Sequence, residues 1–191
     1  MEREGVMPDD RIVELYWQRD ESAIRQTADA YGDYCHYIAY NILHNREDAE
    51  ESVNDTWLDA WNSMPPHKPS ILSAFLGKIT RRISIDRWRR RNADKRGGGQ
   101  MPLVWDELAD CIADPDGTDA AISRDEMARI IRDFLDALPL MERRVFLKRY
   151  WFMAPIADIA KELDVTKSKI TSMLHRTRRK LRDKLESEGY A

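Results

Sequence analysis

The polar side chains best placed to bind a ligand lie near the C-terminus, on one face of a predicted helix. They follow Thr166, which can cap a helix N-terminus, and they are Lys167, Ser168, Thr171, Ser172 and His175. Side chains of these types form hydrogen bonds with base edges in the major groove of DNA. The run RTRRKLRDK at 176–184 follows directly, and its charge suits phosphates. The first chemistry that the sequence predicts is therefore nucleic-acid binding.

Two short helices joined by a tight turn would hold these side chains in place. Between residues 156 and 175 the apolar residues have the spacing of a helix-turn-helix; they are Ile159, Leu163, Val165, Ile170 and Met173. Ala160 is small enough for the two helices to cross closely. Asp164 occupies the turn, where the backbone needs a positive φ that Asp tolerates better than most residues. The window therefore predicts a helix-turn-helix whose second helix faces DNA.

The charged residues are divided into four blocks of alternating sign, although the net charge of the 191 residues is only −3. Residues 1–64 hold 5 basic and 15 acidic side chains, and residues 97–142 hold 3 and 11. Residues 65–96 hold 10 basic and 2 acidic side chains, and residues 143–191 hold 13 and 6. Two basic blocks in an acidic chain predict two separate surfaces for polyanions, with acidic faces left for solvent or a protein partner.

Enzymatic chemistry has little support in the sequence. The four His residues are scattered, and the carboxylates of residues 47–59 have no His among them, so we expect no metal, no cofactor and no catalytic residue. Cys35 and Cys111 form no C-x-x-C pair, and their role stays open. The triple glycine at 97–99 lacks the lysine of a phosphate-binding P-loop. The N-terminus has no signal-peptide pattern and no apolar run is long enough for a bilayer, so we expect a cytoplasmic protein.

Helical spacing continues through the N-terminal part, which we assign to a first domain at 9–96. Asn45 has the residue type of a helix N-cap, and an apolar stripe follows it until Pro65 and Pro66 end the helix; the stripe is Ala49, Val53, Trp57, Ala60 and Met64. Ser70 can cap the next helix, in which leucine, isoleucine and phenylalanine face inward while lysine and arginine occupy the other faces.

The rest of the chain is a linker and a second helical domain. Residues 97–119 are rich in Gly, Pro and Asp and read as a flexible linker. Helical spacing begins again at Ala120, breaks at Pro139 and continues to the end of the basic run, so the second domain spans 120–187. No useful β alternation occurs. The sequence therefore predicts an all-α protein of two small helical domains joined by a flexible linker, the C-terminal one containing the helix-turn-helix.

Four motifs in this order resemble the sigma factors of bacterial RNA polymerase, specifically the small extracytoplasmic-function (ECF) type. In the first domain they are DAEESVNDTWLDAW at 48–61 and AFLGKITRRISIDRWRR at 74–90. In the second they are LPLMERRVFLKRY at 138–150 and IADIAKELDVTKSKITSMLHRTRRKL at 156–181. The chain departs from the family pattern in having Arg82 for Asn, Asn54 for Gln, Ser52 for Leu and Asp164 for Gly.

The resemblance implies roles for exposed positions. Glu51, Asn54 and Asp55 match the family's surface for the clamp helices of the largest polymerase subunit. The minus-ten promoter element would be held at the following residues of the first domain: His67, Lys68, Arg81, Arg82, Arg89 and Arg90. In the second domain, Lys167, Ser168, Thr171 and Ser172 would read the minus-thirty-five element, with Arg176 and Arg179 on phosphates.

The partners that the resemblance implies are core RNA polymerase, through its clamp helices and the flap of its second large subunit, and promoter DNA. An anti-sigma protein wedged between the domains is a further expected partner, because a flexible linker permits closed and open arrangements. Such a protein directs promoter-specific initiation and is not an enzyme. Two alternatives stay open: a stand-alone helix-turn-helix regulator, and a helical nuclease that uses the carboxylates of 47–59 around a divalent metal.

Overall fold

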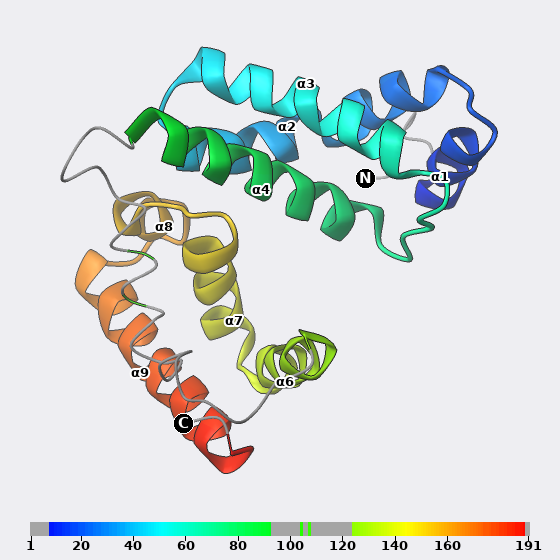
Figure 1. Cartoon of the computed structure of the whole chain (residues 1–191). Helices are drawn as coiled ribbons and strands as arrows, with labels where there is room; N and C mark the ends of the chain where they lie inside the picture. Colours follow the sequence, from blue (N-terminus) through cyan, green and yellow to red (C-terminus); the bar gives the residue numbers. More distant parts are fainter. Residues whose placement is uncertain (1–7, 93–103, 105–106, 108–123, 190–191) are drawn as a thin grey trace. The chain divides into compact units, whose positions relative to one another are not determined.

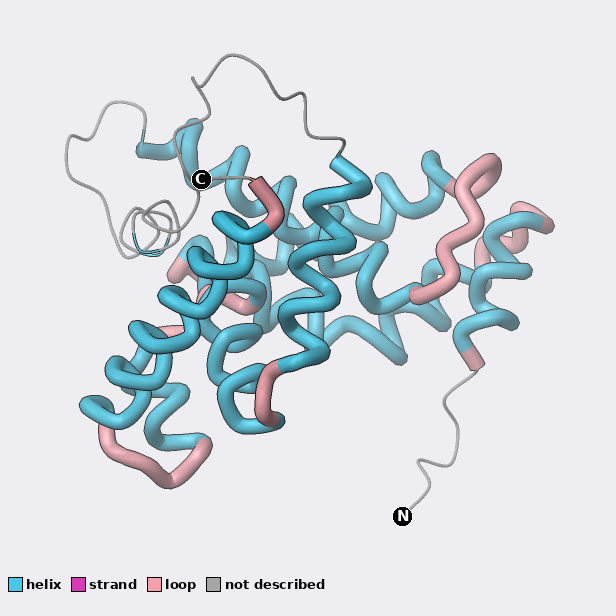
Figure 2. Tube along the Cα trace, turned by 90° about the horizontal axis from the view of Figure 1, so that it is seen from below, coloured by secondary structure: helices cyan, strands magenta, loops and turns pink. Residues whose placement is uncertain are grey.

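The computed structural model describes residues 8–92, 104, 107 and 124–189. Helices make up most of this described part, and it contains no strand (Figure 2). The chain divides into two compact units, residues 1–96 and 97–191, each with its own core. The prediction of an all-α protein is confirmed.

Four helices form the first unit (Figure 1): α1 (Asp9–Trp17), α2 (Ser22–Leu43), α3 (Arg46–Ser63) and α4 (Leu72–Asn92). Helices α2, α3 and α4 pack against one another, and α1 packs on α2. Their shared core is formed by fully buried side chains such as Ile12, Tyr16, Ile38, Ile42 and Leu76. The predicted stripe of α3, from Ala49 to Met64, is buried throughout.

Local chain signals account for the ends of α3. The side chain of Asn45 accepts a hydrogen bond from the Asp48 amide at 2.9 Å, which confirms the predicted cap. The helix ends at Ser63, just before the two prolines, as predicted. The predicted Ser70 cap is wrong, because α4 begins at Leu72 and the amide of Phe75 bonds to the carbonyl of Ile71. Ser70 thus lies one residue too early to cap this helix.

The second unit contains α6 (Arg124–Ala137), α7 (Leu140–Phe146), the π-helical turn η1 (Leu147–Trp151), α8 (Ile156–Glu162) and α9 (Lys167–Ser187). Helix α9 packs against α6, α7 and α8, and an aromatic cluster of Phe134, Phe146 and Tyr150 lies in the core. The wide turn η1 places the Phe152 amide on the Leu147 carbonyl at 3.0 Å. The sequence predicts an α-helix over these residues, whereas the structure has the π-helical turn η1.

Helices α8 and α9 form the predicted helix-turn-helix. Asp164 has a φ of 51°, and the Thr166 side chain accepts a hydrogen bond from the Lys169 amide at 3.2 Å, so both predicted turn features are confirmed. The core side of the motif buries Ile159 and Ile170. These contacts set the rotation of α9 about its axis and thereby decide which of its side chains face outward.

Most of the predicted linker, 97–119, lies outside the described residues. Two of its residues are described, and both belong to the second unit: Val104 is buried, and Glu107 forms ion pairs with Arg149 and Arg178. The second unit therefore includes part of the segment that composition alone assigns to a linker.

Candidate nucleic-acid interface

The first half of α9 presents a continuous polar face. The predicted base-reading residues are all exposed there: Lys167, Ser168, Thr171 and Ser172, with His175 one turn later. Ile170, Met173 and Leu174 lie on the opposite, buried side. Thr171 Oγ1 also donates to the Lys167 carbonyl at 3.0 Å, which restricts the rotation of this side chain. The structure thus brings the predicted side chains together on one exposed face.

The cations of α9 fall into two groups. Arg176 and Arg179 are exposed and form no ion pair within the described residues. In contrast, Lys180 bonds Glu142 at 2.7 Å and Arg178 turns inward to the Tyr150 hydroxyl at 2.8 Å. Arg176 and Arg179 are therefore available to phosphates, as is Arg182, which is also exposed and forms no ion pair within the described residues.

A buried ion-pair cluster that sequence reasoning missed lies under α9. Arg149 is only 5% exposed, and its Nε and Nη2 donate to the Glu107 carboxylate at 3.2 and 2.7 Å. Arg178 Nη1 lies 3.5 Å from the same carboxylate, and the Tyr150 hydroxyl donates to it at 3.1 Å. Burial raises the pKa of Tyr150 to about 12, so this hydroxyl stays protonated. The cluster ties Glu107 to η1 and α9.

An apolar groove opens on the second unit between α6, α7, η1 and α9. Its volume is about 250 Å³, and the residues that line it are Met127, Ile131, Leu135, Phe146, Leu147, Tyr150, Trp151, Leu181 and Leu185. A groove of this lining suits an apolar side chain of a protein partner better than a nucleic acid.

The predicted arginines of α4 have different surroundings. Arg82, Arg89 and Arg90 are exposed, whereas Arg81 is half-buried and burial lowers its pKa to about 10. Arg82 forms an ion pair with Asp59 of α3. Arg89 lies 4.0 Å from Asp86, a separation at which an exposed pair contributes little. Arg89 and Arg90 are thus the more accessible of these four arginines.

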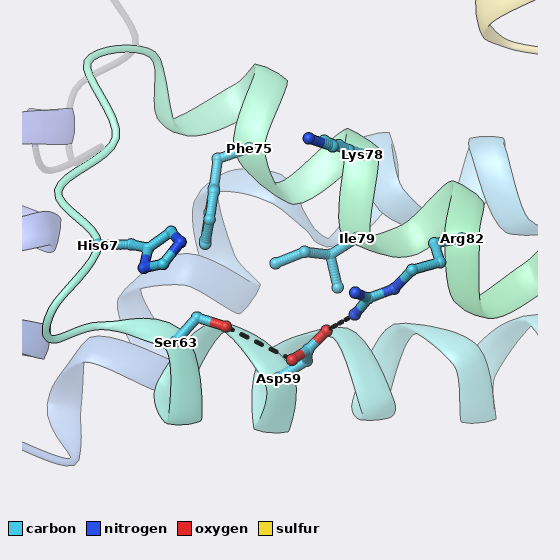
Figure 3. Close-up of a pocket in the computed structure, with 7 residues that line it drawn as sticks. All are labelled: Asp59, Ser63, His67, Phe75, Lys78, Ile79 and Arg82. Carbon is cyan, nitrogen blue, oxygen red and sulfur yellow. Dashed lines mark hydrogen bonds and ion pairs between the residues drawn. The ribbon is translucent and has the colours of Figure 1, made fainter. Parts of the chain in front are cut away.

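A pocket of about 440 Å³ lies between α3, α4 and the loop that joins them (Figure 3). It brings together two predicted residues, His67 and Arg82, with others that the sequence did not single out; the lining is Asp59, Ser63, His67, Phe75, Lys78, Ile79 and Arg82. Figure 3 shows the His67 and Phe75 rings at one end of the pocket and the Asp59–Arg82 pair at the other. Aromatic faces beside polar groups suit a planar, hydrogen-bonding ligand such as a base.

Helix α1 and the turn after it hold the loop that carries His67. The Trp17 indole donates to the His67 carbonyl at 3.2 Å, and Lys68 lies 5.7 Å from the centre of the Trp17 ring. Arg19 Nη1 donates to the carbonyls of Trp61 and Met64 at 2.6 and 3.2 Å. Lys68 therefore lies on the loop but outside the pocket.

The predicted polymerase-docking residues lie on the exposed face of α3. The side chains of Glu51 and Asp55 are 62% and 46% exposed, and Asn54 is exposed between them. Leu58 continues this face one turn later with 59% exposure, an apolar position that the sequence analysis did not include. We call Glu51, Asn54, Asp55 and Leu58 the α3 face.

Three sets of ion pairs join α3 to α4. Arg87, which the sequence analysis did not select, pairs with both Glu51 and Asp55, and its Nη2 lies 2.8 Å from Asp55 Oδ2. Arg91 pairs with Asp48 and Arg82 with Asp59, one turn or more to either side. Hydrogen bonding from Arg87 lowers the pKa of Glu51, which favours its ionised form.

The described residues contain neither a candidate metal site nor a candidate membrane span. No group of three or more His, Cys, Asp or Glu side chains in that part of the chain could hold a metal ion. No helix there is both long and apolar enough to span a bilayer.

Comparisons with known proteins match both units. The family model of sigma-70 region 2 matches residues 27–93, and that of sigma-70 region 4 matches residues 128–181. The ECF RNA polymerase sigma factor SigW of Bacillus subtilis (strain 168) is 22% identical over 173 residues, which cover 87% of this chain and 90% of SigW.

A second relative is the ECF RNA polymerase sigma factor SigE of Mycolicibacterium smegmatis (strain ATCC 700084 / mc(2)155), 24% identical over 155 residues. The match covers 81% of this chain but only 58% of SigE. The region 2 match spans α2 to α4, which carry the pocket and the α3 face, and the region 4 match includes the helix-turn-helix. With both regions present in family order, the chain belongs to the sigma-70 family of sigma factors and to its ECF type.

Proposed function

We propose that this protein binds core RNA polymerase and directs it to promoters with a minus-ten and a minus-thirty-five element. The observation that carries the proposal is the exposed polar face of α9, in which four exposed polar side chains precede Arg176 and Arg179, which form no ion pair within the described residues. In a helix-turn-helix, the second helix enters the major groove with its N-terminal residues against the bases. Lys167, Ser168, Thr171 and Ser172 would read the minus-thirty-five element, and Arg176 and Arg179 would contact phosphates.

The minus-ten element would bind to the first unit. We place one unstacked base of the melted strand in the pocket beside His67 and Phe75, where stacking on an aromatic ring contributes about 1–3 kcal/mol per base. Arg82, Arg89 and Arg90 would hold the neighbouring phosphates, and Lys68 would contact the strand beside the pocket. Arg81, which is half-buried, would join them only by extending its side chain. Promoter melting is then favoured by capture of unstacked bases.

Two surfaces would bind the polymerase. The α3 face offers carboxylates around an exposed leucine, a combination that suits the clamp helices of the largest subunit if these present cations and an apolar contact. The apolar groove between α6, α7, η1 and α9 would receive the flap of the second large subunit. An anti-sigma protein that covers either surface would block docking.

All of these roles are binding roles, so the protein is not itself an enzyme and needs no cofactor. The polymerase supplies the catalysis, in the cytoplasm where it meets the chromosome. Each unit is small and would hold DNA weakly by itself, whereas two units on one polymerase act at a high effective concentration. This separates the proposal from a stand-alone regulator, which would bind its site without polymerase.

Run-off transcription with purified bacterial core polymerase on genomic fragments tests the proposal. We expect new promoter-specific transcripts only when the protein is added. Asp55→Arg should abolish them and reduce core binding while the helical circular-dichroism spectrum is unchanged. Asp29→Arg is the matched control, because Asp29 is exposed on α2, outside the α3 face, and forms no ion pair within the described residues. Absence of transcripts with the unmodified protein, or metal-dependent cleavage of the DNA, would refute the proposal.

A further inference from the structure

Arg87 of α4 forms ion pairs with both carboxylates of the α3 face, those of Glu51 and Asp55. We propose that Arg87 is a positioning residue for polymerase docking: it holds Glu51 and Asp55 in a fixed arrangement that the polymerase binds, without itself touching the polymerase. The inference rests on the proposed function of the α3 face. It adds a residue on α4, in the basic block, to an interface that the sequence assigns to α3 alone.

The geometry of the guanidinium supports this role. Its two terminal nitrogens bind different carboxylates, Nη1 that of Glu51 and Nη2 that of Asp55. Glu51 and Asp55 are four residues apart on α3 and would repel one another as free carboxylates. One planar cation between them removes that repulsion and fixes the rotamers of both side chains.

Exposure shows which groups a partner can reach. The Arg87 side chain is only 18% exposed, whereas those of Glu51 and Asp55 are 62% and 46% exposed. Glu51 Oε2 and Asp55 Oδ2 are the oxygens that face Arg87. The other two carboxylate oxygens, Glu51 Oε1 and Asp55 Oδ1, accept no hydrogen bond within the described residues. A carboxylate accepts several hydrogen bonds, so the outer oxygens stay available to a cationic partner. Arg87 thus contacts the inner oxygens of both carboxylates and leaves their outer oxygens accessible.

The neighbouring pairs give an internal comparison. Arg91 pairs with Asp48 and Arg82 with Asp59, so each of these arginines has one carboxylate and neither carboxylate belongs to the α3 face. Arg91 resembles Arg87 in linking α4 to α3, and it also donates to the Leu43 carbonyl at 2.9 Å. Loss of Arg91 should therefore disturb the contact between the helices while leaving the α3 face ordered.

Affinity for core polymerase, measured by competition with a labelled copy of the full chain, tests the inference. Arg87→Met keeps the aliphatic stem and removes the charge; we expect about tenfold weaker binding, because two side chains must then be ordered on docking. Arg87→Lys should give an intermediate loss, since a single ammonium cannot span both carboxylates as a guanidinium does. Arg91→Met is the matched control and should change the affinity less than twofold.

A double-mutant cycle separates positioning from a general effect on folding. In the background Glu51→Gln with Asp55→Asn, Arg87→Met should have no further effect on affinity, because there is no charged pair left to position. An equal loss in both backgrounds would overturn the inference, as would tighter binding of Arg87→Met, which would show that Arg87 masks the carboxylates. If the unmodified protein does not bind core polymerase, or if Asp55→Arg binds it normally, the proposed function of the α3 face is wrong, and the inference about Arg87 is wrong with it.

Discussion

Replacing Glu107 by Gln should destabilise the second unit and leave the first unit unchanged. The substitution keeps the size of the side chain but removes the negative charge that faces Arg149 and Arg178. Arg149 has little access to water, with its side chain 6% exposed, and its remaining hydrogen bond within the described residues is to the Ala154 carbonyl at 3.2 Å. An almost fully buried guanidinium would thus lose its counter-charge.

The magnitude follows from the burial of the two partners. Breaking a fully buried ion pair by removing one charge costs about 3–5 kcal/mol. Glu107 is still 24% exposed and Arg178 is 20% exposed, so water screens part of the interaction. After allowing for that screening, we expect Glu107→Gln to lower the free energy of unfolding of the second unit by roughly 2–3 kcal/mol. Hydrogen exchange of the α9 core amides should then be about 30- to 150-fold faster where exchange requires opening of the whole unit.

Hydrogen exchange resolved by peptide suits this protein because the two units need not unfold together. Peptides from 140–187 should lose protection, and peptides from 9–92 should not. The double variant Glu107→Gln with Arg149→Met should regain about 1 kcal/mol or more, because a buried pair replaced by uncharged groups leaves no isolated charge. The reasoning is refuted if Glu107→Gln leaves protection unchanged, if the first unit loses protection equally, or if the double variant is less stable than Glu107→Gln alone.

Two other predictions concern single side chains. Arg176→Ala should weaken promoter complexes in a filter-binding titration. The slope of log affinity against log salt concentration should fall in magnitude by about 0.9, which corresponds to one phosphate contact. The control is Arg129→Ala on α6, an arginine that lies near Glu126 and Asp133, and it should leave the slope unchanged. Cys35 is fully buried and burial raises its pKa to about 11, so its contribution to stability should be complete below about pH 9 and decline as the pH rises toward 11. In a Cys111→Ser background, Cys35 of the folded protein should resist iodoacetamide at pH 8, and rapid alkylation under native conditions would contradict its burial.

Features encoded within a few residues could be predicted from the sequence. Asn45 and Thr166 cap their helices, and Asp164 has the expected positive φ, because each depends on its own side chain and its nearest backbone groups. The polar face of α9 also followed from spacing, since burial of Ile170 and Met173 fixes the outward side. The predicted Ser70 cap is wrong because Ile71, whose side chain cannot accept a hydrogen bond, occupies the N-cap position of α4.

Features that depend on contacts between distant segments could not be predicted in this way. Arg87 reads as one of many exposed cations in the sequence, and only the packing of α3 on α4 brings it to Glu51 and Asp55. A signal was present in the opposite charges of the two helices, but the choice of partners needs their relative rotation. Glu107 lies 42 residues from Arg149 in a segment whose composition is typical of a linker. The pocket likewise needs the α3–α4 loop folded over both helices.

Ion pairing also changes what the charge blocks mean for function. The block 65–96 carries a large positive excess, yet Arg82, Arg87 and Arg91 each neutralise carboxylates of α3. In the second unit, the side chains of Arg149 and Arg178 are likewise committed to Glu107. Within the described residues, four arginines on the helices that we assign to DNA are exposed and form no carboxylate ion pair: Arg90, Arg176, Arg179 and Arg182. Counterion release on binding should therefore reflect these unpaired cations more than the number of arginines in the sequence, because a paired arginine must leave a carboxylate before it can gain a phosphate.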